Sequence, residues 1–259
     1  MRHHALRALA LLALCLVALQ IAFALRVALM LVFDPQSTTF QRSEIWRLLR
    51  QHGQVIWAQA WVDDAAISAN LKRAVIASED AGFVDHGGVE WDAIEQAWGK
   101  NQRAQSRADR QSQSQVQAQA QAQSRNAKVA PKKPVAPKLV GAPTITQQLA
   151  KNLLLSGERT TLRKAQELLL TLMLEAVLSK ERLLTIYLNN VEWGEGIFGA
   201  QAAARHYFRV DAARLGAEPA ARLAVMLPAP KRFERQIGGA YVSSRAATIT
   251  ARMPAVVLP

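Results

Sequence analysis

The amino-terminal segment is an almost continuous apolar run, and this run constrains the molecule more than any other feature. Residues 8–25 read ALALLALCLVALQIAFAL, broken only by Gln20, and apolar sequence resumes after Arg26 as VALMLVF. About 20 such residues suffice for a helix to cross the hydrocarbon core of a bilayer. No polar face interrupts the run, as it would in the surface helix of a globular protein. We therefore expect residues 8–33 to form a transmembrane anchor.

The flanking charges predict how the anchor is oriented. Arg2 and Arg7 precede it, so the positive-inside rule places residues 1–7 in the cytoplasm as a short tail and the chain after residue 33 on the exported side. The alternative is a cleaved signal peptide, because residues 22–24 (AFA) have the small-x-small form of a cleavage site. Both interpretations export the working part of the protein.

The net charge of +12 is concentrated outside the predicted body of the protein. Residues 100–140 carry nine basic residues and one acidic residue, and most of the segment is Gln, Ala, Ser and Pro. Such a composition cannot bury enough apolar surface to offset its ordering entropy. We predict one domain over residues 34–259, interrupted by a flexible basic insertion over 100–140. This insertion either is solvated or lies along anionic phospholipid; nucleic acid is not an expected partner of an exported segment.

Helical periodicity dominates the rest of the sequence and predicts a mainly α fold. Only residues 54–61 alternate like a strand, and Asp63 or Asp64 is the expected N-cap of the first helix of the domain. The single cysteine excludes an internal disulfide. The expected helices cover residues 67–79, 144–155, 162–179, 180–188, 200–208 and 218–227.

Two neighbouring carboxylates, Glu79 and Asp80, end the first of these helices and precede a glycine-rich loop that contains His86. A carboxylate in such a position can be partly desolvated and face a cleft, which is a setting for acid or base catalysis. The ordinary alternative is a solvated carboxylate at a helix end and a loop histidine that bonds to the backbone.

A second cluster follows the string GAPTITQQLAKN (residues 141–152). Arg and Lys side chains bind phosphate well, and four of them occur within fourteen residues. Glu167 shares a helical face with two of them, which predicts an intrahelical ion-pair ladder; alternatively, Glu167 holds a divalent cation or orients a lysine. The four cationic residues are Lys151, Arg159, Arg163 and Lys164.

A third cluster, YLNNVEWGEGIFG (residues 187–199), stops a helix with asparagine and then turns through three glycines. We expect its apolar and aromatic residues to pack, and Tyr187 and Asn189 to satisfy backbone groups. The sequence contains no metal motif, nucleophile elbow, phosphate loop or dinucleotide fingerprint.

Taken in this order, the strings IASEDAGFVDHGG, TITQQLAKN, RKAQE and YLNNVEWGEGIFGAQAAARHYF resemble glycosyltransferase family 51, the glycosyltransferase domain of peptidoglycan polymerases. The resemblance extends from Ile45 to Met253 apart from the insertion, and the single anchor suggests the monofunctional form. It implies a lysozyme-like helical fold that makes β-1,4-linked glycan from lipid II and releases undecaprenyl diphosphate. It also implies a single-pass protein of the bacterial inner membrane with a periplasmic catalytic domain.

The resemblance further implies the partners and the roles of individual residues. Glu79 matches the catalytic glutamate, the general base, and Asp80 would support it; Glu167 matches the second glutamate, near the diphosphate and a divalent cation (Mg²⁺ or Mn²⁺). The partners would be lipid II, the growing lipid-linked glycan, the membrane and other cell wall synthesis proteins, with no organic cofactor. The remaining site positions are Phe83, His86, Thr146, Gln147, Gln148, Lys151, Asn152, Arg159, Arg163 and Lys164.

Two substitutions and the insertion between the first two motifs depart from the family pattern, and two rival functions remain open. Glu90 stands where the family usually has Asp, and Pro143 replaces a Ser beside the diphosphate site. A lytic enzyme with Glu79 as a general acid is one rival, although a neutral leaving group has no use for four cations. An inactive scaffold of cell wall synthesis, anchored in the membrane, is the other.

Overall fold

The computed structural model describes residues 2–92, 95, 96, 99, 102–108, 110, 113, 114, 143–155, 157 and 160–259. The chain divides into two compact units, one made of Met1–Val89 and Pro143–Pro259 and the other of Glu90–Ala142. In the second unit residues 102–108 are helical, whereas most of the predicted insertion lies outside the described residues. The fold described below is that of the first unit.

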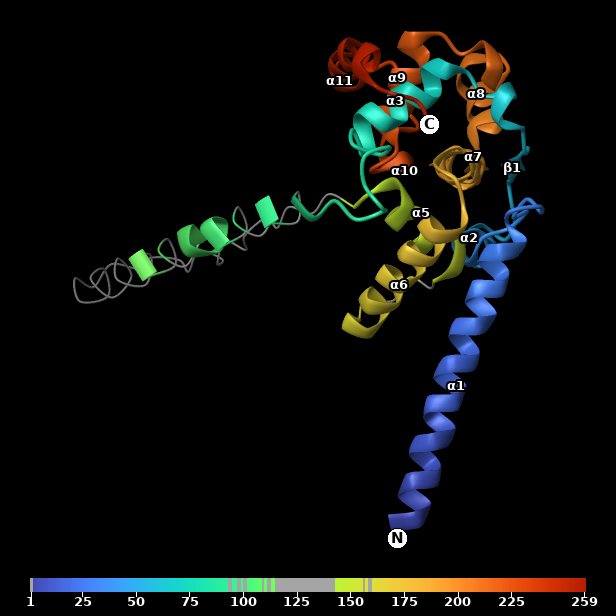
Figure 1. Ribbon diagram of the computed structural model, residues 1–259. Helices are drawn as coiled ribbons and strands as arrows, with labels where there is room; N and C mark the ends of the chain where they lie inside the picture. Colours follow the sequence, from blue (N-terminus) through green and yellow to red (C-terminus); the bar gives the residue numbers. More distant parts are fainter. Residues whose placement is uncertain are drawn as a thin grey trace. The chain divides into compact units, whose positions relative to one another are not determined.

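The first unit is mainly helical, which confirms the predicted fold class (Figure 1). Three one-turn 3₁₀ helices, η1 (Asp64–Ala66), η2 (Ala212–Arg214) and η3 (Met253–Ala255), connect longer elements. Three strands form one small sheet: β1 (Ala58–Gln59), β2 (Glu192–Gly194) and β3 (Ile197–Phe198). The α-helices are α1 (Arg2–Leu29), α2 (Thr39–His52), α3 (Ala69–Glu79), α5 (Ile145–Leu154), α6 (Thr161–Val177), α7 (Lys180–Asn190), α8 (Ala200–Phe208), α9 (Ala217–Met226), α10 (Pro230–Phe233) and α11 (Ala240–Arg252).

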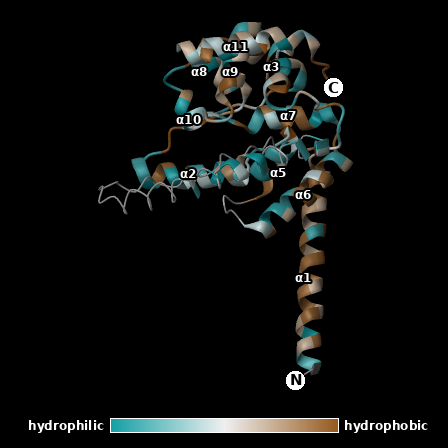
Figure 2. Cartoon of the chain, turned by 90° about the vertical axis from the view of Figure 1, so that its left-hand side faces the viewer, coloured by the Kyte–Doolittle hydropathy of each residue, from teal (hydrophilic) through white to brown (hydrophobic). Residues whose placement is uncertain are grey.

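Helix α1 covers residues 8–29 of the predicted anchor, whose last four residues form turns, and it begins before the anchor, so that the predicted tail is also helical from Arg2. Within the described part of the chain, His3–Leu29 is the one helix long and apolar enough to cross a membrane, with a mean hydropathy of 2.7. Figure 2 shows apolar residues along its length. These properties are compatible with the predicted membrane anchor.

The carboxyl-terminal part of α1 is attached to the helical domain by side-chain hydrogen bonds. Gln20 and Gln166 of α6 exchange two amide hydrogen bonds, of 2.9 and 3.0 Å. Arg182 of α7 donates to the carbonyl oxygens of Met30 (2.8 Å) and Phe33 (3.1 Å), just beyond the end of α1. A cation at this end also complements the helix dipole. The only polar side chain that interrupts the apolar run thus has a partner on the domain.

Helix α7 forms the centre of the domain, because Leu183–Asn190 is buried on every side. Helix α5 packs against both α6 and α7, while α3 and α11 pack against α9 (Figure 1). Helices α3 and α5–α9 lie within two residues of their predicted bounds, whereas α2 and α11 were not predicted. Helix α2 starts at a capping box in which Thr38 and Gln41 satisfy one another's backbone N–H groups.

The predicted N-cap of α3 is wrong. Ser68 caps this helix, and its hydroxyl oxygen accepts a hydrogen bond from the backbone N–H of Leu71 (3.1 Å). Asp64 instead begins η1, where its carboxylate pairs with Lys72 and accepts a hydrogen bond from the hydroxyl of Thr185 (2.9 Å). Asp64 and Ser68 are both common capping residues. Because η1 occupies residues 64–66, α3 begins only after Ser68.

The sheet has the order β1-β3-β2, with β1 parallel and β2 antiparallel to β3. The predicted strand over residues 54–61 is confirmed as the shorter β1, and the turn-rich third cluster forms the other two strands. Gly196 joins them with φ +72°, and a Cβ there would lie 2.1 Å from the carbonyl oxygen of Ile56. Only glycine fits this turn, which places Glu192 beside α2 and α10.

Candidate functional site

Asp80 follows the last residue of α3 and connects this helix to the start of α5. Its side chain is 1% exposed. One carboxylate oxygen accepts a hydrogen bond from the backbone N–H of Ile145 (3.0 Å), and the other accepts from His86 Nε2 (2.8 Å). The negative charge lies at the N-terminus of α5, where the helix dipole favours it. Asp80 therefore fixes the relative positions of α3 and α5.

The loop after Asp80 is held in place by hydrogen bonds within the loop and by one from α7. His86 Nδ1 accepts a hydrogen bond from the backbone N–H of Gly88 (3.1 Å), so the ring proton is on Nε2 and points to Asp80. Lys180 of α7 donates to the carbonyl oxygen of His86 (2.6 Å) and lies 4.6 Å from the centroid of the Phe83 ring. Phe83 is fully buried. The loop is thus fixed to the core.

Glu79 is joined to α5 and α7 by a chain of side-chain hydrogen bonds. Gln148 Nε2 donates to Glu79 Oε2 (2.9 Å), and the hydroxyl of the fully buried Tyr187 donates to Gln148 Oε1 (3.0 Å). Burial raises the pKa of Glu79 and the charge of Asp80 adds to the rise, although hydrogen bonds from Gln148 and Ser78 oppose it. A raised pKa makes this carboxylate a better proton acceptor near neutral pH.

Helix α6 carries a group of paired charges at its amino-terminal end. Arg163 donates to Glu167 Oε2 (3.0 Å), and Lys164 pairs with the other oxygen of the same carboxylate, which confirms the predicted ion-pair ladder. The Glu167 side chain is only 5% exposed, whereas that of Lys164 is 62% exposed. Arg163 Nε is buried without a hydrogen-bond partner among the described residues. Arg163 and Lys164 are two cations around the single carboxylate of Glu167, so the group carries a net positive charge.

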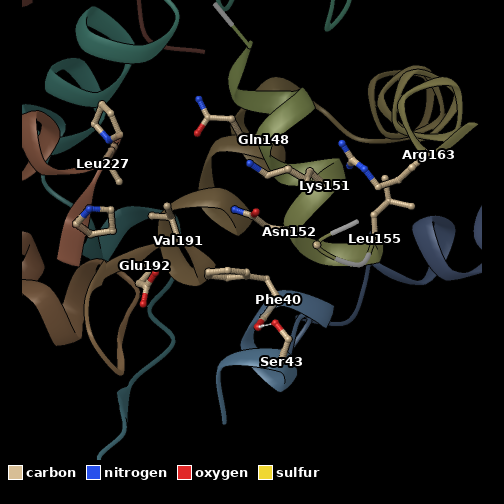
Figure 3. Close-up of a pocket in the computed structure, with 13 residues that line it drawn as sticks. Phe40, Ser43, Gln148, Lys151, Asn152, Leu155, Arg163, Val191, Glu192 and Leu227 are labelled. Atoms are coloured by element: carbon tan, nitrogen blue, oxygen red, sulfur yellow. Dashed lines mark hydrogen bonds between the residues drawn. The ribbon is translucent and has the colours of Figure 1, made fainter. Parts of the chain in front are cut away.

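A cavity of about 440 Å³ lies between α5, α6, α2 and the β2 strand (Figure 3). Gln148, Lys151 and Asn152 line it from α5, and Arg163 lines it from α6. The side away from Arg163 is formed by Glu192, while Phe40 and Ser43 of α2 and Leu227, Pro228 and Pro230 complete the wall. The cavity is therefore cationic on one side and carries a carboxylate on the other.

Comparison with known proteins identifies the family. The transglycosylase family model matches residues 49–133 and 117–254 of this chain. The chain belongs to the transglycosylase family. The biosynthetic peptidoglycan transglycosylase of Bordetella pertussis is 47% identical over 226 residues, which cover 87% of this chain and 82% of the relative. The protein of the same name from Burkholderia pseudomallei is 46% identical over 242 residues, or 93% of this chain and 82% of the relative.

This membership confirms the expected class of enzyme, a glycosyltransferase, and the expected lysozyme-like helical fold. It does not test the roles of individual residues in the transglycosylase domain. Those roles therefore stay predictions, and the structure adds where each side chain lies.

Four of the predicted substrate-binding residues line the cavity together: Gln148, Lys151, Asn152 and Arg163. Glu79 is not among the lining residues, but Gln148, which donates a hydrogen bond to it, is. Lys164 and Glu167 lie on α6 outside the lining, and Arg159 lies outside the described residues. The structure thus brings the base candidate within one side chain of the cationic pocket.

Several other predicted residues occupy supporting positions. Phe83 and Thr146 are 0% exposed, and the Thr146 hydroxyl donates to Glu175 (2.5 Å). Gln147 forms the capping box of α5 with Thr144. Their side chains hold the loop and α5 in place and are not among the residues that line the cavity, so their predicted contact with substrate stays a prediction.

The residues of this transglycosylase do not form a cation site by themselves. Both oxygens of Glu167 are engaged by Arg163 and Lys164. Throughout the described ranges, no three His, Cys, Asp or Glu side chains gather as metal ligands. A divalent cation ordinarily needs six or more oxygen ligands, so a cation beside Glu167 would take most of them from the substrate diphosphate, and the predicted role of Glu167 stays a prediction.

The two substitutions that depart from the family pattern have different structural settings. Pro143 precedes the N-cap Thr144, so its missing N–H removes no donor from α5, and its carbonyl oxygen accepts a long hydrogen bond (3.4 Å) from Gln148. Glu90 begins the second unit. Neither residue contacts Glu79 or Arg163 through a hydrogen bond described here.

Sequence reasoning missed two polar residues of the site. Tyr187 was expected to bond to backbone, but its hydroxyl donates a hydrogen bond to the side chain of Gln148. The same expectation for Asn189 is confirmed, since its side chain bonds to the backbone of Val62. Glu192 was assigned no role, yet it lines the cavity. The same string contains a second glutamate, Glu195, so no signal in the sequence singled out Glu192.

Proposed function

We propose that the protein polymerises the glycan strands of peptidoglycan from lipid II. The observation that carries the proposal is the cavity whose cationic side holds Lys151 and Arg163 and whose Gln148 is bonded to the carboxylate of Glu79. A base beside a diphosphate-binding surface is what a glycosyl transfer from a sugar diphosphate requires.

The diphosphate of the donor would bind at the cationic side of the cavity. Arg163 and Lys151 supply charge-assisted hydrogen bonds to phosphate oxygens. Lys164, and Arg159 beyond the described residues, would extend this surface. Positive charge here stabilises undecaprenyl diphosphate as it leaves.

Glu79 would act as the general base in a single displacement. It removes the proton from the 4-hydroxyl of one lipid-linked disaccharide, whose oxygen then bonds to the anomeric carbon of the growing lipid-linked glycan. The bond between that carbon and the diphosphate oxygen breaks, and its electron pair leaves with the diphosphate. Attack on an α-linked donor inverts the anomeric centre and gives a β-1,4 bond.

The positions of supporting groups favour this assignment of the base. Burial raises the pKa of Glu79, and the hydrogen bond from Gln148, itself held by Tyr187, orients the carboxylate. Asp80 and His86 fix the loop that follows. A divalent cation bound to the substrate diphosphate remains a proposal, and no step above depends on it.

Membrane attachment is consistent with a lipid-linked substrate. Helix α1 is long and apolar enough to span a bilayer, and Arg2 and Arg7 at its amino-terminal end favour a cytoplasmic start. We propose a single-pass protein of the bacterial inner membrane with its catalytic domain on the periplasmic side, where lipid II and the growing glycan would be its partners.

The test is to give the purified full-length protein two substrates in separate reactions. With lipid II in detergent and a divalent cation, the proposal predicts a glycan polymer and released undecaprenyl diphosphate. With purified sacculi, it predicts no soluble muropeptides. Muropeptide release without polymer would establish the lytic rival, and inactivity of a folded protein in both reactions would favour the scaffold.

A further inference from the structure

Glu192 presents a buried carboxylate to the side of the cavity that the mechanism above does not use. It lies on β2, away from Arg163 (Figure 3), and its side chain is only 9% exposed. A buried carboxylate normally accepts hydrogen bonds or pairs closely with a cation, because an uncompensated one destabilises the fold.

The cation nearest to Glu192 is shared with a second carboxylate. Lys231 of α10 donates a hydrogen bond to Glu44 of α2 and lies 3.3 Å from Glu192 Oε1, to which it makes no aligned hydrogen bond. Arg47 adds a further hydrogen bond to Glu44 (2.7 Å). Oε1 of Glu192 has no hydrogen-bond partner among the described residues. The local cations thus satisfy Glu44 and leave Glu192 only partly compensated.

The two sides of the cavity together specify the chemistry of a ligand. The side with Lys151 and Arg163 favours an anion, whereas the side with Glu192 favours a hydrogen-bond donor and repels an anion. A ligand that satisfies both must carry hydroxyl or amide N–H groups next to its phosphates. An N-acetylated sugar bonded to a diphosphate has this arrangement, and a polyprenyl diphosphate without sugar lacks it.

We propose that Glu192 accepts a hydrogen bond from a hydroxyl or N-acetyl N–H group of the sugar that is joined to the diphosphate. Glu192 is then a specificity-determining residue that distinguishes the sugar-bearing substrate from the released polyprenyl diphosphate. This role rests on the proposed function, because it assumes that lipid II occupies the cavity. The contact would be made by the carboxylate oxygen that is not beside Lys231, because Oε1 is buried 3.3 Å from the Lys231 ammonium group.

The experiment compares Glu192→Gln and Glu192→Ala with Glu195→Gln in the full-length protein. Glu195 lies in the same hairpin, is also a glutamate and pairs with Arg47, but it is absent from the cavity lining. Three quantities are measured: the KM and kcat for lipid II, and the Kd for undecaprenyl diphosphate, which has no sugar. Circular dichroism verifies that each variant is folded.

A hydrogen bond to a charged acceptor predicts a rise of about tenfold or more in the lipid II KM of Glu192→Gln, and a larger rise for Glu192→Ala. The kcat should stay within about threefold and the Kd for undecaprenyl diphosphate within about twofold, because neither depends on this contact in the proposal. Glu195→Gln should match the wild type in all three.

Distinct outcomes overturn this inference and the proposed function. If the wild type polymerises lipid II and Glu192→Gln has an unchanged KM, the sugar contact is wrong and the proposed function stands. An equal weakening of lipid II and undecaprenyl diphosphate would likewise reject it, since the contact would not be with sugar. If the wild type neither polymerises nor binds lipid II, the proposed function itself fails.

Discussion

Replacing Glu192 with glutamine should stabilise the folded protein at alkaline pH. Burial raises the pKa of Glu192 to about 7 from an ordinary 4.5; Lys231 on α10 and Arg47 on α2 oppose the rise, and the charge of Glu44 on α2 adds to it. The folded state therefore binds this proton more tightly than the unfolded chain does. Stability is lost as the pH rises from about 4.5 to about 7, and a neutral glutamine avoids that loss.

The size of the effect follows from the two pKa values. They differ by about 2.5, and each pH unit between them corresponds to about 1.4 kcal/mol of unfolding free energy. The ionised carboxylate thus lowers stability by about 3 kcal/mol at pH 8 and by about 1 kcal/mol at pH 5. Lys231 keeps its hydrogen bond to Glu44 in the variant, so the substitution leaves no unpaired cation.

The assay is urea-induced unfolding of the full chain in detergent micelles, followed by tryptophan fluorescence at both pH values. The stability advantage of Glu192→Gln over the wild type should grow from about 1 kcal/mol at pH 5 to about 3 kcal/mol at pH 8. Glu195→Gln should change stability in the opposite direction, because the hydrogen bond from Arg47 lowers the pKa of Glu195. A destabilised Glu192→Gln at pH 8, or a difference independent of pH, would refute the reasoning.

Three further substitutions test the supporting structure. Asp80→Asn leaves one of two buried donors without an acceptor and should lower the unfolding free energy by about 2 to 5 kcal/mol, measured by urea titration against the wild type. Gln20→Leu strands the amide of Gln166 and should lower the melting temperature in detergent, and adding Gln166→Leu should recover part of the loss; no recovery would argue against the amide pair. Gly196→Ala meets a backbone oxygen at positive φ and should reduce the yield of folded protein, whereas Gly87→Ala, with open space around it, should not.

The helices of the domain could be predicted because their sequences carry a strong local pattern. Residues 200–208 form a helix with the predicted bounds, and α5–α7 end within two residues of theirs. The N-cap of α3 could not be chosen from the sequence, since Asp63, Asp64 and Ser68 all suit that position. The strands β2 and β3 are too short to show alternation, and they form because a glycine turn pairs β2 with β3 while β3 lies against β1.

The residue types of the site could be predicted from the sequence, but their positions relative to the cavity could not. The sequence places Glu79 and the α5–α6 cations in separate helices, and only the packing of α5 against α7 shows that Gln148 lies between Glu79 and the cavity. Glu192 could not be recognised from a local pattern, because its exposure and its competition with Glu44 for Lys231 depend on three elements that meet only in the fold.

The central claim, that the Glu79 carboxylate is the base, is tested most directly by the single-turnover rate of lipid II polymerisation with Glu79→Gln. Asp85→Asn is the matched control, because Asp85 is an exposed carboxylate in the adjoining loop. The account predicts that Glu79→Gln folds like the wild type and loses between about 100- and 10,000-fold in rate, while Asp85→Asn retains it. A folded Glu79→Gln that polymerises lipid II within about tenfold of the wild-type rate would contradict the account.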